Sequence, residues 1–177
     1  TLFRESGSLE YKGQIKEGQW HGIGTLYWEN GELKYDGWFE QGKEHGSGTF
    51  FRESGNLEYK GQIKEGQWHG IGTSYWENGE LKYDGQFEQG REHGRGTLFR
   101  ESGNLEYKGQ IKEGQWHGIG TSYWENGDLK YNGQFEQGRE HGRGTLFRES
   151  GSLEYKGQIK EGQWHGIGTL YWENGEL

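Results

Sequence analysis

The 177-residue sequence contains no cysteine, proline or methionine. Without cysteine, disulfides and thiolate metal sites are excluded. No segment approaches the roughly 18 consecutive apolar residues of a membrane-spanning helix, and no apolar segment opens the chain as it would in a signal peptide. We therefore expect a cytoplasmic protein without a membrane span. Because an initiator methionine is missing, we expect the sequence to be a piece of a longer protein or a trimmed chain.

Apolar residues are also scarce, at 28% of the chain, and the mean hydropathy is -1.21. Such a composition leans toward disorder, but aromatic residues make up 16% and large rings bury much area each. The net charge is -8 and no basic run is present. Nucleic acids and acidic lipid headgroups both require clustered cations, so we expect neither a nucleic-acid nor a membrane partner.

The residues that are present repeat every 24 positions. All 36 glycines lie on this lattice, as do regularly spaced threonines. Two unit types alternate, which gives a 48-residue super-period: TLFRESGSLEYKGQIKEGQWHGIG and TLYWENGELKYDGWFEQGKEHGSG. Since neither the spacing nor the composition changes along the chain, we expect one continuous array of about seven repeats over residues 1–177.

Within a unit the pattern alternates with period two, which is typical of half-buried strands. We expect strands near residues 9–16 and 22–28, with turns at Glu17-Gly18 and Asn30-Gly31. Each glycine would cost a helix about 1 kcal/mol, and a lone hairpin is only marginally stable. The sequence therefore predicts an all-β fold, an elongated antiparallel array of stacked β-hairpins.

Charges alternate in sign between successive units. One column contains Glu10, Lys34, Glu58, Lys82, Glu106, Lys130 and Glu154. If units stack in register, each charge meets the opposite sign above and below, worth about 0.2–1 kcal/mol per pair. The alternative is that the 48-residue period records duplication only.

Strand parity predicts an apolar side formed by Leu9, Tyr11, Thr25 and Tyr27, with Gly13 beneath the rings. It places the tryptophans on another face: Trp20, Trp28, Trp68, Trp76, Trp116, Trp124, Trp164 and Trp172. One interpretation is structural: arginines of the intervening units (Arg52, Arg100, Arg148) stack on these rings as cation–π pairs. The other is an aromatic groove that binds a partner, a sugar or a quaternary ammonium. Trp38 has no counterpart in other units, and we expect it to be a lone exposed ring or an end contact.

The histidines occupy one lattice position: His21, His45, His69, His93, His117, His141 and His165. Stacked equivalents would lie about 9–10 Å apart, too far to share a zinc ion whose ligands lie at about 2 Å. We therefore expect no metal, and histidines that hydrogen-bond a turn. Active sites need one asymmetric constellation, whereas every carboxylate and histidine recurs here. We expect no enzyme, no catalytic residues and no cofactor.

The pattern Tyr11-x-Gly13-x-Ile15-x-x-Gly18-x-x-His21-Gly22-x-Gly24-Thr25 resembles the MORN repeat. The stretch Asn30-Gly31-x-Leu33-x-Tyr35-x-Gly37 resembles its variant form. The resemblance implies a glycine-rich array of β-hairpins, used mostly as a scaffold, with a structural motif at His21, Gly22, Gly24, His69, Gly70 and Gly72. Some family members are linked to membranes, and some bacterial ones resemble antitoxin components. Ile15 departs from the usual aromatic residue. The high regularity fits both recent duplication and deliberate design.

Together these features predict a non-catalytic structural scaffold or protein–protein interaction module. Two alternatives remain open: an aromatic-groove module that binds a small ligand or glycan, and an antitoxin-like inhibitor of a partner protein. We expect a protein partner, whose identity the sequence does not give, and self-association through the ends of the array.

Overall fold

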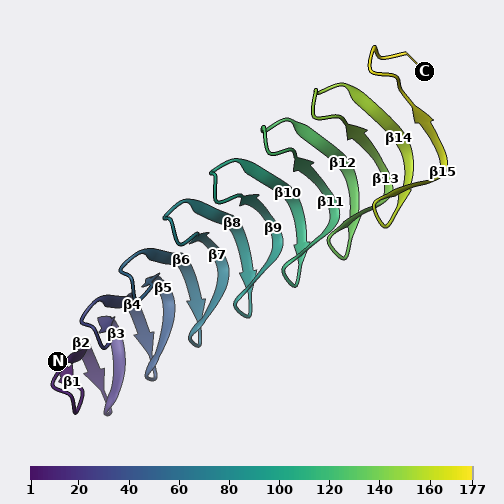
Figure 1. The fold of residues 1–177 in the computed structure, drawn as a ribbon. Helices are drawn as coiled ribbons and strands as arrows, with labels where there is room; N and C mark the ends of the chain where they lie inside the picture. Colours follow the sequence, from purple (N-terminus) through teal and green to yellow (C-terminus); the bar gives the residue numbers. More distant parts are fainter. Residues whose placement is uncertain (177) are drawn as a thin grey trace. The chain divides into compact units, whose positions relative to one another are not determined.

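The computed structural model describes residues 1–176 and contains fifteen β-strands and, over this range, no helix (Figure 1). The predicted all-β class, with hairpin repeats of about 24 residues, is confirmed. The chain divides into two compact units, Thr1–Arg91 and Glu92–Leu177. One continuous array over the whole chain stays a prediction.

In the first unit each strand pairs antiparallel with its neighbours in chain order. The strands are β1 (Leu2–Phe3), β2 (Leu9–Lys16), β3 (Gln19–Tyr27), β4 (Leu33–Glu40), β5 (Lys43–Phe51), β6 (Leu57–Lys64), β7 (Gln67–Tyr75) and β8 (Leu81–Glu88).

The second unit repeats this plan. Its strands are β9 (Arg91–Phe99), which begins at the boundary residue, β10 (Leu105–Lys112), β11 (Gln115–Tyr123), β12 (Leu129–Glu136), β13 (Arg139–Phe147), β14 (Leu153–Lys160) and β15 (Gln163–Leu170).

The two turns of a repeat differ. At Glu17-Gly18 both residues have positive φ (52° and 77°), the geometry of a two-residue type I′ hairpin turn. At Asn30-Gly31 only Gly31 has positive φ (91°). There the amide of Gly31 donates to the carbonyl of Trp28 (3.0 Å), and the amide of Trp28 donates to the carbonyl of Glu32 (2.8 Å). This hairpin therefore closes through a longer loop with a left-handed glycine at its end.

The second strand of each repeat begins earlier than predicted, at Gln19 instead of near residue 22, and ends at Tyr27. The reason is Gly22, whose left-handed φ of 64° forms a bulge without ending the strand. The pairing accordingly jumps from Gly13↔Gly24 to Gln14↔His21. The first strand, Leu9–Lys16, has the predicted bounds.

Within each unit, tyrosines from alternate strands form the core. Tyr11, Tyr35, Tyr59, Tyr83, Tyr107 and Tyr131 are fully buried, and each hydroxyl donates to the backbone carbonyl three residues later, as Tyr59 does to Gln62 (2.7 Å). Burial raises the pKa of Tyr59 to about 12. The rings lie on paired glycines, because a Cβ at Gly72 would stand only 2.3 Å from the Tyr59 hydroxyl.

The predicted apolar side is wrong in its second strand. Tyr11 pairs with Leu26, which is buried, whereas Thr25 pairs with Lys12 on the opposite face. Thr25 donates a hydrogen bond to the hydroxyl of Tyr27 (3.2 Å) on that face. The two-residue turn pairs Lys16 with Gln19, so odd-numbered residues of one strand face even-numbered residues of the next.

Candidate functional site

The first set of tryptophans lies at the open side of the aromatic core. In the first unit Trp68 stacks on Tyr59, with ring centroids 4.6 Å apart and planes 6° from parallel. Phe87 packs edge-on against both rings, at 5.1 Å from Tyr59 and 5.7 Å from Trp68. The same trio recurs in the second unit around Trp116. These indoles are structural, yet they remain half-buried.

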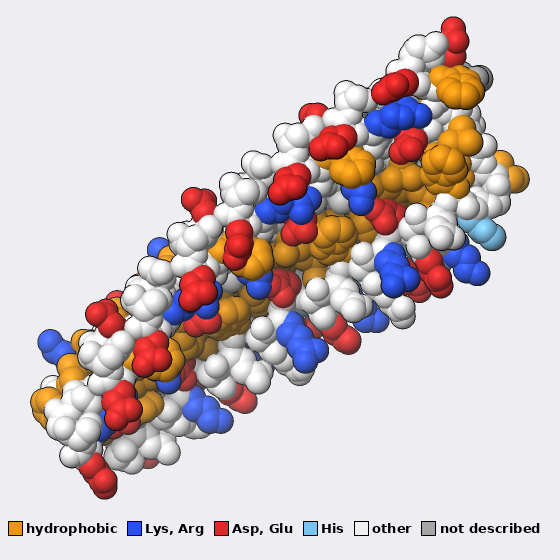
Figure 2. All heavy atoms as spheres, viewed as in Figure 1, with side chains coloured by type: hydrophobic (Ala, Val, Ile, Leu, Met, Phe, Trp, Pro, Cys, Tyr) orange, Lys and Arg blue, Asp and Glu red, His pale blue; other side chains and the backbone are white. Residues whose placement is uncertain are grey.

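We call this surface the aromatic face: half-buried Trp20 and Trp68 in the first unit and Trp116 in the second, with the tyrosine and phenylalanine rings behind them. Within each unit, hydrophobic side chains form a stripe between two borders that carry charged side chains (Figure 2). An apolar stripe with a polar rim is the usual anatomy of a protein-binding surface.

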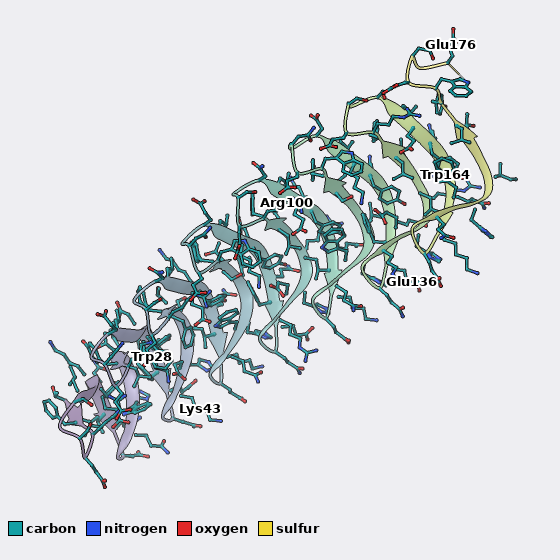
Figure 3. The ribbon with its side chains drawn as sticks, viewed as in Figure 1. Trp28, Lys43, Arg100, Glu136, Trp164 and Glu176 are labelled. Carbon is teal, nitrogen blue, oxygen red and sulfur yellow. The ribbon has the colours of Figure 1, made fainter. Side chains whose placement is uncertain are left out.

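The second set of tryptophans lies elsewhere, in the longer loops. The indole Nε1 of Trp28 donates to the carbonyl of Phe51 (3.0 Å), 23 residues later. In the next repeat Arg52 takes this place, and its Nη2 donates to the carbonyl of Tyr75 (2.7 Å). Trp28 and Arg100, labelled in Figure 3, show the two residue types at this position. The two sets of tryptophans therefore come from different elements, the strands and the longer loops. In the second unit both lie near one surface, because Lys130 lies over Trp124 and also forms an ion pair with Glu140 (3.3 Å), which pairs with Phe135, the ring packed against Trp116.

The tryptophan or arginine at this loop position also determines which charged residue contacts it. The Nζ of Lys34 lies 4.8 Å from the centre of the Trp28 ring, whereas Arg52 forms an ion pair with Glu58 (3.3 Å). Lys82 and Lys130 repeat the first contact, and Glu106 repeats the second. In these three contacts the cation over the tryptophan is a lysine of the same repeat, whereas the first interpretation expected an arginine of the intervening repeat. In the column that begins with Glu10 and Lys34, the charge therefore alternates together with the residue in the loop.

The structure places the motif residues in two different roles. Gly22 and Gly70 adopt positive φ (64° and 65°) at the bulge, while Gly24 and Gly72 lie against the buried tyrosines. Sequence reasoning missed what completes the bulge. The Oε1 of Gln62 accepts a hydrogen bond from the amide of Ile71 (3.0 Å), beside Gly70.

The histidines lie in the same strands as these glycines. His21 pairs with Gln14, and His69 precedes the bulge at Gly70. The Nδ1 of His45 accepts from the amide of Glu65 in a tight turn (3.5 Å), as His93 does from Glu113 (3.4 Å). Within residues 1–176, no group of three or more His, Cys, Asp or Glu residues is arranged to hold a metal ion.

Trp38, which has no counterpart in other repeats, lies on the face opposite the tyrosines and is 45% exposed. It pairs with Ile23 across β3 and β4. Other repeats carry glutamine there, as at Gln86 and Gln134.

Comparison with known families matches this architecture repeat by repeat. The MORN repeat matches residues 11–32, 35–57, 83–105, 107–129, 131–153 and 155–176, and the MORN repeat variant matches residues 68–89. The chain belongs to the MORN repeat family. No curated protein matches it. MORN repeats are a non-enzymatic repeat type and in general serve as modules that interact with proteins or membranes.

Over residues 1–176 the structure contains no helix with the length and hydropathy that crossing a membrane requires.

Proposed function

We propose that this MORN repeat protein is a non-catalytic scaffold whose aromatic face binds an apolar segment of a partner protein. The observation that carries the proposal is a half-buried indole in three alternate repeats (Trp20, Trp68 and Trp116), stacked on a buried tyrosine and bordered by charged side chains. In the fourth such repeat, Trp164 also stacks on a tyrosine but is 50% exposed. Rigid aromatic rings supply large contact area at low entropic cost, and tryptophan is enriched where binding energy concentrates.

The regularity of the repeats supports a scaffold over an enzyme. A catalytic site needs several different groups converging at one place, whereas here each titratable side chain of one repeat recurs in others. The same argument weighs against a selective small-ligand pocket. The glycan-binding alternative needs open tryptophan rings, whereas Trp28 of the loop set is already in contact with Lys34 and donates to the carbonyl of Phe51. No observation favours an antitoxin-like role.

The test is selection of binders from a displayed library of natural protein fragments, followed by measurement of Kd for the purified hits. We expect hits that contribute apolar side chains and lose about tenfold or more in affinity when Trp68→Gln and Trp116→Gln are combined. Trp38→Gln is the matched control, because it makes the same exchange on the opposite face with the residue found at Gln86.

Hits that bind the double variant with unchanged affinity would place the interface elsewhere and refute the proposal. Saturable quenching of tryptophan fluorescence by choline or short glycans at micromolar concentration would favour the small-ligand alternative. Light scattering checks self-association separately, and a concentration-independent monomer mass would contradict it.

A further inference from the structure

The second unit has a groove on its outer face, the face opposite the buried tyrosines. It has a volume of about 640 Å³, and its lining residues come from β9 to β12. Gly96, Gly109 and Gly120 form its floor. A Cβ at Gly120 would point at the Tyr107 ring, so on the outer side these positions present only backbone. The flanking residues of each strand form the two walls.

One wall contains a regular series of side chains. Register pairs join Arg95 to Gln110, Ile119 to Gln134 and Arg143 to Gln158. A second hollow, of about 520 Å³, is lined on β13 to β15 by the equivalent residues: Arg143, Gly144, Thr145, Lys156, Gly157, Ile167, Gly168 and Thr169. Arginine and isoleucine thus alternate along this wall at every second strand.

The groove is cationic although the protein is acidic overall. Arg95, Lys108, Arg143 and Lys156 are exposed, and none of the lining residues of the two hollows, all in the described part of this unit, is acidic. The first unit differs at the equivalent positions, where Ser47 replaces arginine and Asp84 stands in place of Asn132. On a chain of net charge -8, such a local cationic groove selects a ligand with negative charge.

The apolar members of the wall narrow the class of ligand. Ile119 is 60% exposed between Arg95 and Arg143, so the groove offers hydrophobic contact as well as charge. A nucleic acid or a sulfated polysaccharide would bind the arginines and lysines but would make no apolar contact with the isoleucines. A peptide that carries both acidic and apolar side chains can contact the cations and the isoleucines together.

The spacing defines the conformation of that peptide. Every second strand is about 9.6 Å further along the sheet, whereas a polyproline II helix repeats every three residues over about 9.3 Å. A β-strand repeats every two residues, over about 6.6 Å, so its side chains would not match the spacing of the groove residues. We infer that the outer groove of the second unit binds a polyproline II segment of a partner protein, with acidic and apolar residues alternating at every third position. Acidic residues contact Arg95 and Arg143, and apolar residues contact Ile119 and Ile167.

The probe is a fluorescein-labelled peptide, Glu-Pro-Pro-Leu-Pro-Pro-Glu-Pro-Pro-Leu, which spans about 28 Å as a polyproline II helix. Its control has the same composition with the two glutamates adjacent and the two leucines adjacent. Fluorescence anisotropy with the full chain measures both affinities. We expect saturable binding of the first peptide, at least about tenfold weaker binding of the control, and lower affinity at raised salt.

The variants take residues that the first unit already carries. We expect Arg95→Ser, Arg143→Ser and Asn132→Asp, combined, to weaken binding of the first peptide by about tenfold or more, because two cations are lost and one anion is added. Arg139→Ser, at the tight-turn edge outside the groove, is the control and should leave affinity unchanged. A far-UV circular dichroism melt confirms that the variants fold.

Two results would overturn the inference: the same affinity in the triple variant, or equally tight binding of polyglutamate and of single-stranded DNA, which would reveal a general polyanion surface. The inference is independent of the aromatic face. Trp68→Gln with Trp116→Gln should weaken binding of library-selected segments by about tenfold or more and leave the affinity for this peptide unchanged, so each proposal can fail separately.

Discussion

Gly120→Ala tests the physical basis of the fold. The glycine does not have positive φ, so alanine can adopt its backbone conformation. A Cβ there would lie 2.3 Å from the hydroxyl of Tyr107 and 2.6 Å from its ring carbons, closer than any ordinary contact. The buried ring therefore has to move.

Moving Tyr107 has three costs. Its hydrogen bond to the carbonyl of Gln110 (2.7 Å) breaks, which costs about 1–3 kcal/mol for a buried group. Its stacking on Trp116 weakens, by about 0.5–1.5 kcal/mol. Strain in the surrounding core adds about 1–3 kcal/mol. We expect Gly120→Ala to lower the free energy of unfolding by about 3–6 kcal/mol.

The matched control is Gly127→Ala in the neighbouring loop. A Cβ at Gly127 would meet nothing within 4 Å, but φ is 92°. Only backbone strain applies, and we expect a loss of about 1–2 kcal/mol. Urea unfolding followed by tryptophan fluorescence and circular dichroism measures both variants.

A double-mutant cycle with Tyr107→Phe isolates the contact. Phenylalanine removes the hydroxyl nearest the added methyl group, so Gly120→Ala should cost about 1 kcal/mol less in that background. Equal costs for Gly120→Ala and Gly127→Ala, or strict additivity with Tyr107→Phe, would refute the close-contact argument.

Three further predictions concern the core, the loops and pH. The hydroxyl of Ser122 is buried and, among residues 1–176, has no hydrogen-bond partner. Ser122→Leu introduces the residue that other repeats carry, and we expect it to raise the free energy of unfolding in urea by about 1–2 kcal/mol. A lower free energy of unfolding would show that the stacking of Tyr107 on Trp116 needs the serine. Trp28→Arg alone should place two cations together and lower Tm, and adding Lys34→Glu should recover it by recreating the alternate loop pair; no recovery would contradict the pairing. Burial raises the pKa of Tyr59 and Tyr107 to about 12 from 10.0, so the neutral rings contribute stability that is complete below pH 10 and is lost as the pH rises toward 12. This is measured by circular dichroism together with tyrosinate absorbance, and ionisation of all eleven tyrosines near pH 10 without unfolding would contradict it.

The sequence alone determined the fold class, the repeat length and the bounds of the first strand in each repeat. These features are local. Period-two alternation in Leu9–Lys16 and the Glu17-Gly18 turn depend only on residues adjacent in the chain. The absence of a side chain at Gly13 likewise indicated that a ring packs there, whereas the equivalent role of Gly24 was not predicted.

Tertiary structure decided which face each side chain of the second strand occupies. The face that a side chain occupies depends on the register of the hairpin. Counting alternate residues separately in each strand does not take this register into account. The bulge at Gly70 depends on Gln62, a residue of the preceding strand. The 24-residue spacing already places Trp28 and Arg52 at equivalent positions, but their shared hydrogen-bonding role could not be predicted from sequence, because the carbonyls that they reach lie 23 residues away and come within hydrogen-bond distance only when repeats stack. The outer groove exists for the same reason: its walls are single residues from successive strands, brought into line only by the sheet.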